Sequence, residues 1–200
     1  TGGGCGPYMD IFYSDPAPFS VAAHGHELTF FPGGPDRFDA LLAMIGAAQS
    51  TLKLCFYIFA EDASGRLVRD ALVLAARRGV AVTLIVDSFG SDARPAFFAP
   101  LAEAGGSFLL FSPRLSRRYL IRNHQKMAIA DSHTAMIGGF NVADDYFSRP
   151  EAGGWHYLGV QLSGPSVLRL ETWFDQLAAW TADKDSQLLA IRRLVRDWDT

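Results

Sequence analysis

The sequence predicts an α/β protein in which a mixed, mainly parallel central sheet is flanked by helices on both faces, an α/β/α sandwich. Between residues 36 and 111, short apolar runs rich in β-branched residues alternate with amphipathic segments of helical spacing. Such alternation favours parallel pairing through right-handed crossovers. The chain has 200 residues, of which 49% are hydrophobic and 20% charged, so it can bury one sizeable core and about one domain.

The first 26 residues are rich in Gly, Pro and Ala and predict an irregular arm, with a short strand at 10–13. His24 and His26 stand there as His-Gly-His. Two histidines can ligate a metal, but a surface turn is favoured because a third ligand is not evident nearby. Residues 27–31 form the first predicted strand of the domain.

The central part of the chain alternates helices with buried strands. Apolar residues at a spacing of three and four predict helices, and nearly continuous apolar runs predict strands buried on both faces. In order, the expected elements are helix 36–48, strand 51–59, helix 64–78, strand 80–87, helix 93–104 broken by Pro95 and Pro100, and strand 106–111.

The last part contains two apolar runs separated by a turn, and then further helices. The expected elements are strands 126–130 and 134–137, a short helix 142–147, an antiparallel or edge strand 155–162, a helix beginning at Gly164-Pro165, and an amphipathic helix 184–198. Cys5 and Cys55 have neither metal-ligand spacing nor a disulfide framework, and Cys55 is expected in the core.

Four side chains with complementary chemistry occur around the two apolar runs: His124, Lys126, Asp131 and Asn141. His124 and Lys126 are two residues apart, so they project to the same side of an extended segment. Gly138 and Gly139 permit close approach of backbone or substrate. An imidazole can act as nucleophile or general acid and base, an ammonium supplies charge, and an amide donates hydrogen bonds. This combination suits a phosphate ester, whereas a capped strand with a polar rim is the alternative.

The spacing His-x-Lys, four residues, Asp, six residues, Gly-Gly-x-Asn resembles the motif of the phospholipase D superfamily. The Gly-Gly version and the following Asn-Val-Ala-Asp-Asp-Tyr are most similar to the bacterial cardiolipin synthase branch. The resemblance extends over about residues 34–180. Its other elements are Tyr57-Ile58-Phe59 with Asp62, Arg77 to Val82, Asp87 with Gly90-Ser91, and Gly164 to Val167.

The resemblance implies that His124 attacks a phospholipid phosphorus and forms a phosphohistidine, while Lys126 and Asn141 stabilise the phosphoryl oxygens. Asp131 is expected to orient Lys126 or a neighbouring backbone group. The expected substrate-binding residues are Gly138, Gly139, Tyr57, Arg122 and Arg118. The phosphatidyl group would pass to an alcohol, such as the headgroup of the anionic lipid phosphatidylglycerol. Neither a metal nor an organic cofactor is implied.

Family members use two copies of the motif, and this sequence contains one. The second half is therefore expected from a longer chain or from the partner in a homodimer, and the similarity to the first half of cardiolipin synthases favours the longer chain. The expected organisation is an irregular arm (1–26), a phospholipase D-like catalytic half-domain (27–182) and a C-terminal helix leading to a linker or second half (183–200).

The sequence departs from the family where many relatives have Trp-(Arg/His)-Asp after the motif. Here Trp155-His156-Tyr157 places a tyrosine at the acidic position. A nucleophilic imidazole usually needs a partner on its far nitrogen. Glu151, Asp145 or Asp144 are the candidate replacements, and weakened or altered activity is the alternative.

The distribution of charge in the sequence bears on the alternative functions. The net charge is −3, but residues 104–130 hold no acid and five cations: Arg114, Arg117, Arg118, Arg122 and Lys126. This basic window is either a solvated loop or a rim that attracts anions. A single-motif dimeric nuclease and a non-catalytic half-domain that binds anionic headgroups are the alternative functions. Nucleic acid is disfavoured by the acidic total and the lack of a basic-aromatic stripe.

A run of about 18 apolar residues is not present in the sequence, so a membrane span is not expected. The expected location is cytoplasmic, with peripheral contact to the inner membrane.

Overall fold

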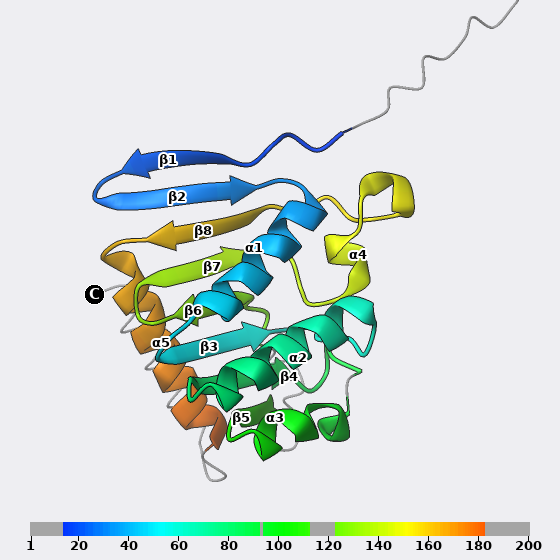
Figure 1. Cartoon of the computed structure of the whole chain (residues 1–200), viewed down its shortest axis with the longest axis vertical. Helices are drawn as coiled ribbons and strands as arrows, with labels where there is room; N and C mark the ends of the chain where they lie inside the picture. Colours follow the sequence, from blue (N-terminus) through cyan, green and yellow to red (C-terminus); the bar gives the residue numbers. More distant parts are fainter. Residues whose placement is uncertain (1–13, 93, 113–122, 183–200) are drawn as a thin grey trace, which may run out of the picture.

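The computed structural model describes residues 14–92, 94–112 and 123–182 (Figure 1). Several predictions from the sequence lie outside these ranges. They are the short strand at 10–13, Cys5, the helix at 184–198, and the arginines Arg114, Arg117, Arg118 and Arg122. Among the described helices, none combines the length and apolar character needed to cross a bilayer.

The described residues form one eight-stranded sheet with the order β1-β2-β8-β7-β6-β3-β4-β5 (Figure 1). A mixed sheet is confirmed, but the prediction that it is mainly parallel is wrong, because only the β3–β4 and β4–β5 pairs run parallel. The strands are β1 (Phe19–Ala23), β2 (His26–Phe31), β3 (Thr51–Phe56), β4 (Ala81–Asp87), β5 (Ser107–Phe111), β6 (Met127–Ala130), β7 (Thr134–Gly138) and β8 (Gly159–Ser163).

Connection lengths explain the mixed pairing. Parallel neighbours need a crossover of a dozen or more residues, and helix-containing crossovers join β3 to β4 and β4 to β5. In contrast, only three residues separate β6 from β7, so the chain must reverse directly. Asp131 and Ser132 make this reversal with φ values of 54° and 55°. Strand β6 therefore pairs antiparallel with β7, and its other neighbour, β3, also runs antiparallel to it.

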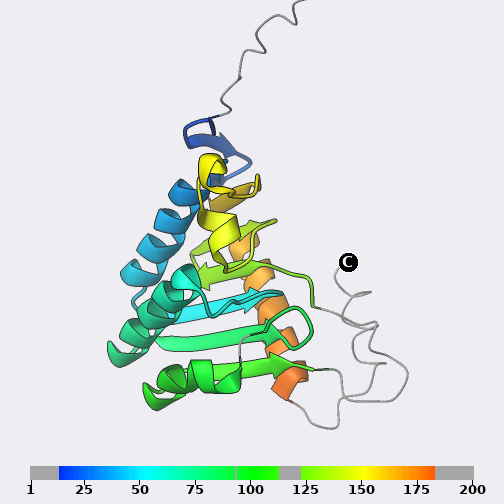
Figure 2. The same ribbon diagram turned by 90° about the vertical axis from the view of Figure 1, so that its right-hand side faces the viewer.

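Helices cover both faces of the sheet, which confirms the α/β/α sandwich. Figure 2 shows α1 (Gly34–Ala47), α2 (Ala63–Arg77) and α3 (Ala99–Glu103) on one face and α5 (Ser166–Ala182) on the other. The predicted break at Pro95 and Pro100 is observed, because the 3₁₀ turn η1 (Pro95–Phe98) precedes α3. The short α4 (Asp144–Phe147) and η2 (Pro150–Ala152) lie beyond one end of the strands (Figure 1).

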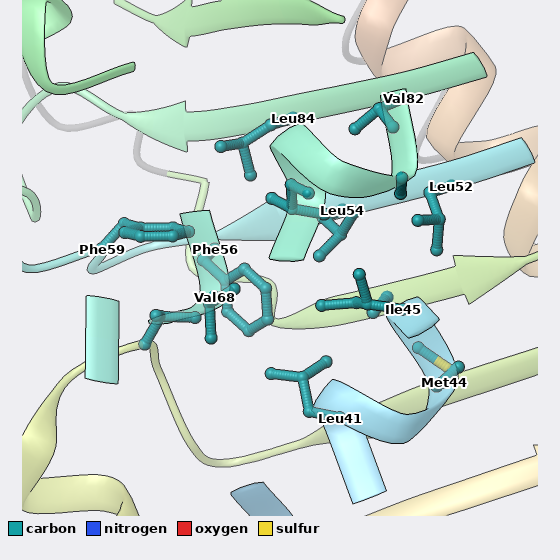
Figure 3. Packing of buried hydrophobic residues seen from close by; sticks show 14 of the residues in the cluster. Leu41, Met44, Ile45, Leu52, Leu54, Phe56, Phe59, Val68, Val82 and Leu84 are labelled. Atoms are coloured by element: carbon teal, nitrogen blue, oxygen red, sulfur yellow. The ribbon is translucent and has the colours of Figure 1, made fainter. Parts of the chain in front are cut away.

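Each face of the sheet has its own apolar core. Figure 3 shows the larger core, in which Leu41 and Ile45 of α1 lie with Leu54 and Phe56 of β3. The second core is built by α5 against the opposite face and includes Cys55, which is fully buried as predicted. Burial raises the pKa of the Cys55 thiol to about 12, so it is an uncharged apolar group at neutral pH. Two buried faces explain the nearly continuous apolar runs of the central strands.

Two predictions about the outer strands are corrected. Residues 19–23 are not irregular: they form β1, which pairs with β2 through the two-residue turn His24-Gly25. Both turn residues have positive φ, 50° and 75°, as such hairpins require. Strand β8 is antiparallel as expected but begins at Gly159 and lies between β2 and β7, so it is not an edge.

Candidate active site

One end of the sheet, where β3 and β7 finish and β6 begins, holds six of the predicted site residues: Tyr57, His124, Lys126, Gly138, Gly139 and Asn141. This end is on the right in Figure 1. Tyr57 follows the last residue of β3, and Lys126 precedes the first residue of β6. Gly138 ends β7, and Asn141 lies three residues beyond it. Because β6 pairs antiparallel with both neighbours, its start lies beside the ends of β3 and β7. The fold therefore brings residues 57, 126 and 141 to one place.

His124 and Lys126 contact each other directly. Nζ of Lys126 lies 3.2 Å from Nδ1 of His124 and donates to the His124 carbonyl oxygen at 2.7 Å. The His124 side chain is exposed, whereas Lys126 is buried, and burial lowers the pKa of the Lys126 ammonium. An ammonium group has hydrogens to donate and no lone pair. A charged Lys126 can therefore only donate to Nδ1 of His124, and this contact favours the tautomer with the ring proton on Nε2.

Tyr57 packs against both of these groups. Its ring centroid is 4.7 Å from that of His124, and Nζ of Lys126 lies 5.4 Å from the Tyr57 centroid. At this distance the aromatic ring attracts the ammonium group. Gly90 approaches Tyr57 so closely that a Cβ there would lie 2.6 Å from the Tyr57 Cε2 atom. Tyr57, one of the expected substrate-binding residues, thus lies beside the imidazole.

Asn141 is buried, and both ends of its amide have partners. Its Oδ1 accepts from the N–H of Ile58 at 2.9 Å, and its Nδ2 donates to the Tyr146 hydroxyl oxygen at 2.8 Å. The backbone next to it is also fixed, because Val142 N donates to Ile58 O and Val142 O accepts from Ala60 N. These bonds join the exit of β7 to the exit of β3 and bring Asn141 to the site.

Gly138 and Gly139 allow close approach, and the structure identifies what approaches them. A Cβ on Gly139 would lie 2.6 Å from Cδ1 of Tyr157, and a Cβ on Gly138 would collide with the Leu158 carbonyl oxygen. The ring of Tyr157, the residue at the family's acidic position, therefore lies over Gly139. These glycines are needed by the protein's own packing at this end of the sheet.

Asp131 does not lie with the other motif residues. It follows the last residue of β6, whereas His124 precedes the first, and four strand residues at about 3.3 Å each separate the two ends. Its carboxylate accepts from the backbone N–H groups of Gln49, Ser50 and Thr51 at 2.7 to 2.9 Å. Burial alone would raise the pKa of Asp131, but these three donors outweigh it and lower the pKa. Asp131 thus orients backbone at the start of β3 and has no contact with Lys126.

A buried acid next to the site was only partly anticipated from the sequence. Asp87 ends β4 and is 1% exposed. One carboxylate oxygen accepts from Phe89 N and Gly90 N and caps the turn after β4, and the other accepts from Asn123 N at 2.8 Å. Asn123, also buried, hydrogen-bonds to the Cys55 sulfur through its amide. The residue before His124 is therefore anchored to β4 and β3.

The three candidate replacements for the missing acid do not reach His124. Within the described residues, the His124 ring has no carboxylate in hydrogen-bond contact. Asp144 accepts from Ser64 N at 2.7 Å, and its own N–H donates to Asp62, so it caps α2. Asp62 caps the same helix through Gly65 N. In the described part of the chain, Nδ1 of His124 faces the Lys126 ammonium group and not a carboxylate.

Comparison with known proteins identifies the family. The model for the "Cardiolipin synthase, PLD-like domain" family matches residues 41–177. The chain belongs to this family. It is 39% identical to the major cardiolipin synthase ClsA of Bacillus subtilis over 161 residues, covering 78% of this chain and 33% of that protein. It is 33% identical to a cardiolipin synthase of Clostridium perfringens over 156 residues, covering 76% and 32%. The chain thus spans about a third of the length of these relatives.

The fold of this phospholipase D-like domain is confirmed by a solved structure. Nuc from Salmonella typhimurium, described as a phospholipase D family member, superposes with a TM-score of 0.57 at 24% identity. The match covers 76% of this chain and 93% of that one. The resemblance drawn from the motif, to the phospholipase D superfamily and its cardiolipin synthase branch, is therefore confirmed for the domain.

Proposed function

We propose that this phospholipase D-like domain supplies one half of a phosphatidyltransferase of the cardiolipin synthase type, acting on phospholipid phosphodiesters. The observation that supports this most directly is the convergence of His124, Lys126 and Asn141 from two different strands onto one end of the sheet. An exposed imidazole next to a buried ammonium and a fixed amide offers a nucleophile with donors for phosphoryl oxygens. Similarity to the cardiolipin synthases supports the substrate class.

In the proposed reaction, a phosphodiester enters beside Lys126, and a phosphoryl oxygen replaces Nδ1 of His124 as acceptor of the ammonium. The imidazole proton can then reside on Nδ1, which frees Nε2. The Nε2 lone pair forms a bond to phosphorus as the bond from phosphorus to the leaving alcohol breaks. A second imidazole, from the other half, gives its proton to the leaving oxygen. In the second step the acceptor alcohol loses its proton to that imidazole, and its oxygen displaces His124 from phosphorus.

Lys126 and Asn141 are the proposed electrostatic partners of this transfer. Negative charge on the phosphoryl oxygens is stabilised by donors that are already oriented, and Lys126 is buried next to the site. One such donor is worth about 3 kcal/mol of barrier. Asn141 has one amide hydrogen bonded to Tyr146, so its second hydrogen remains for the phosphate.

The proposed partners follow from the single copy of the motif in this sequence. A second motif-bearing half, from a longer chain or from a second copy, supplies the other imidazole. Phosphatidylglycerol or a similar anionic phospholipid is the proposed substrate, reached by peripheral contact at the cytoplasmic face of the inner membrane. The basic window that contains Arg118 and Arg122, which are outside the described residues, is proposed to attract the anionic headgroups.

The test compares two histidine variants of the full-length gene product on phosphatidylglycerol vesicles, with cardiolipin measured by mass spectrometry. His124→Asn should reduce the rate by about a thousandfold or more, because the amide cannot form the covalent intermediate. His133→Asn is the matched control, because His133 is exposed in the β6–β7 turn at the other end of the strand. Equal rates for wild type and His124→Asn would contradict the proposal, as would a wild-type protein that binds vesicles without turnover.

A further inference from the structure

Tyr146 is in direct hydrogen-bond contact with Asn141 and was not anticipated as a site residue. It belongs to α4, is 5% exposed, and accepts a hydrogen bond from Nδ2 of Asn141 at 2.8 Å. The direction of this bond is fixed by the other end of the amide. The Ile58 N–H can only donate, so the Asn141 atom that faces it at 2.9 Å is the carbonyl oxygen. The NH₂ group must therefore face the Tyr146 hydroxyl.

This geometry uses one of the two amide hydrogens and leaves the other with a defined direction. We propose that Tyr146 is a positioning residue, which holds the Asn141 amide so that its second N–H is presented to a phosphoryl oxygen beside Lys126. The inference rests on the proposed phosphoryl-transfer function of this site. Without the phenol oxygen, the carbonyl end would still be held by Ile58, but the NH₂ end would lose its partner.

The Tyr146 ring is itself held on several sides. It packs against both Trp155 and Tyr157, with a centroid distance of 5.0 Å to each ring, and those two rings also contact each other at 6.3 Å. Its backbone carbonyl accepts from the buried guanidinium of Arg37, which also donates to the carbonyl of Tyr157. Burial raises the pKa of the Tyr146 phenol, so the neutral form is present throughout the neutral range. A rigid, uncharged phenol is a suitable fixed acceptor for the amide.

Arg37 explains why this arrangement is stable. It is fully buried in α1, and its described hydrogen-bond partners are the backbone carbonyls of Phe31, Pro32, Tyr146 and Tyr157. Removal from water lowers the pKa of its guanidinium to about 10, which still leaves it charged at neutral pH. Its plane lies against the Phe140 ring, 5.4 Å from the centroid. The buried Arg37 side chain thus contacts the backbone of both Tyr146 and Tyr157 and the ring of Phe140, the residue before Asn141.

The first experiment removes a single oxygen. In the full-length gene product, Tyr146→Phe keeps the ring contacts but deletes the acceptor, and we expect kcat to fall about tenfold, the equivalent of one hydrogen bond, with KM little changed. Tyr157→Phe is the matched control, because it deletes the hydroxyl of the neighbouring ring and leaves the Asn141–Tyr146 bond in place. An unchanged kcat in Tyr146→Phe would overturn the proposal.

A double-variant cycle separates positioning from a general structural role. If Tyr146 acts only through Asn141, then Asn141→Ala with Tyr146→Phe should be no slower than Asn141→Ala alone. Losses that multiply would show that Tyr146 acts independently of Asn141 and would overturn the proposal. Thermal unfolding of each variant verifies that the fold is retained.

An NMR measurement tests the same bond without requiring turnover. The two side-chain N–H resonances of Asn141 should be widely separated and slow to exchange in this 200-residue chain. In Tyr146→Phe, one of them should move towards the values of a solvated amide, and Tyr157→Phe should leave both in place. If these shifts occur but the wild-type protein has no transferase activity, the positioning geometry stands and the proposed function fails. If the resonances are unchanged in Tyr146→Phe, the positioning role is wrong whatever the activity.

Discussion

Lys126 donates to both the backbone carbonyl and Nδ1 of His124, at 2.7 and 3.2 Å. The family resemblance predicted a carboxylate beside the imidazole of His124, and the structure instead places an ammonium group at Nδ1. A carboxylate would place the ring proton on Nδ1, whereas the ammonium places it on Nε2. In the mechanism that we propose, this tautomer has to change before Nε2 attacks phosphorus.

The tautomer of His124 is the first testable consequence. Long-range ¹H–¹⁵N spectra of this chain near pH 8 should show His124 with its proton on Nε2. Addition of inorganic phosphate should shift the Nδ1 resonance, because the phosphate competes for the Lys126 ammonium. His133, which lies in a turn at the other end of β6, serves as the internal control and should not respond. A proton found on Nδ1 in the phosphate-free chain would contradict the observed contact.

The buried carboxylate of Asp87 should hold the His124 segment in place. Asp87→Asn replaces one acceptor oxygen with a donor facing an N–H group, either at Asn123 or at Phe89 and Gly90. We expect a loss of about 1–3 kcal/mol in the free energy of unfolding and faster hydrogen exchange at the Asn123 amide. Asp175→Asn is the control, because Asp175 is 55% exposed in an ion pair with Lys53 and should cost much less. Equal exchange at Asn123 in both variants would show that the bond is dispensable.

Asp131 should contribute to stability in a way that depends on pH. Its hydrogen bonds lower its folded-state pKa below the ordinary value of about 3.9, so its contribution is fully present above that value. The contribution is lost as the pH falls through the lower, folded-state pKa. Asp131→Asn should therefore be about 1–2 kcal/mol less stable than wild type at pH 7, with the difference shrinking in acid. Denaturant titrations at pH 7 and pH 3 check this, and a difference that grows in acid would have the wrong sign.

Gly139 should not tolerate a side chain while Tyr157 covers it. Gly139→Ala places a Cβ 2.6 Å from the Tyr157 ring, and the required shift should cost about 1–3 kcal/mol. Gly46→Ala is the matched control, because Gly46 lies in α1 with open space around its Cβ position and should be stabilised by about 0.5–1 kcal/mol. Combining Gly139→Ala with Tyr157→Ser should recover most of the loss. A double variant as unstable as Gly139→Ala alone would place the clash elsewhere.

Local patterns were sufficient to locate most elements of the fold. The apolar runs of β3, β4, β6 and β7, and the helical spacing of α1 and α2, were all predicted within three residues at either end. Strand β1 was missed because its side chains are exposed on both faces, so it has no alternation of apolar and polar residues. The mainly parallel sheet was wrong because the strand–helix alternation was extended to β6 and β7, whose three-residue connection excludes a crossover.

The site was predictable only as far as the motif reaches. Spacing placed His124 and Lys126 on one side of an extended segment, and the two side chains contact each other. The structure also brings Asn141 to the exit of β3, where it accepts from Ile58 N. Spacing could not show the role of Asp131, because its hydrogen-bond donors, the backbone N–H groups of residues 49–51, are distant from it in the sequence. Tyr146 belongs to the Asn-Val-Ala-Asp-Asp-Tyr segment that carries the resemblance, but its contact with Asn141 depends on how α4 packs and is not visible in the sequence.

The central claim is that His124 forms a covalent bond to phosphorus, and trapping the intermediate tests it most directly. The full-length gene product is mixed with phosphatidylglycerol carrying a ³²P-labelled phosphate and quenched in alkaline denaturant, because phosphohistidine is stable in base and labile in acid. Peptide mapping should then place the label on His124, and the label should be absent from His124→Asn. Label on a histidine of the second half would instead make His124 the proton donor. Turnover with no trapped label would contradict the covalent mechanism.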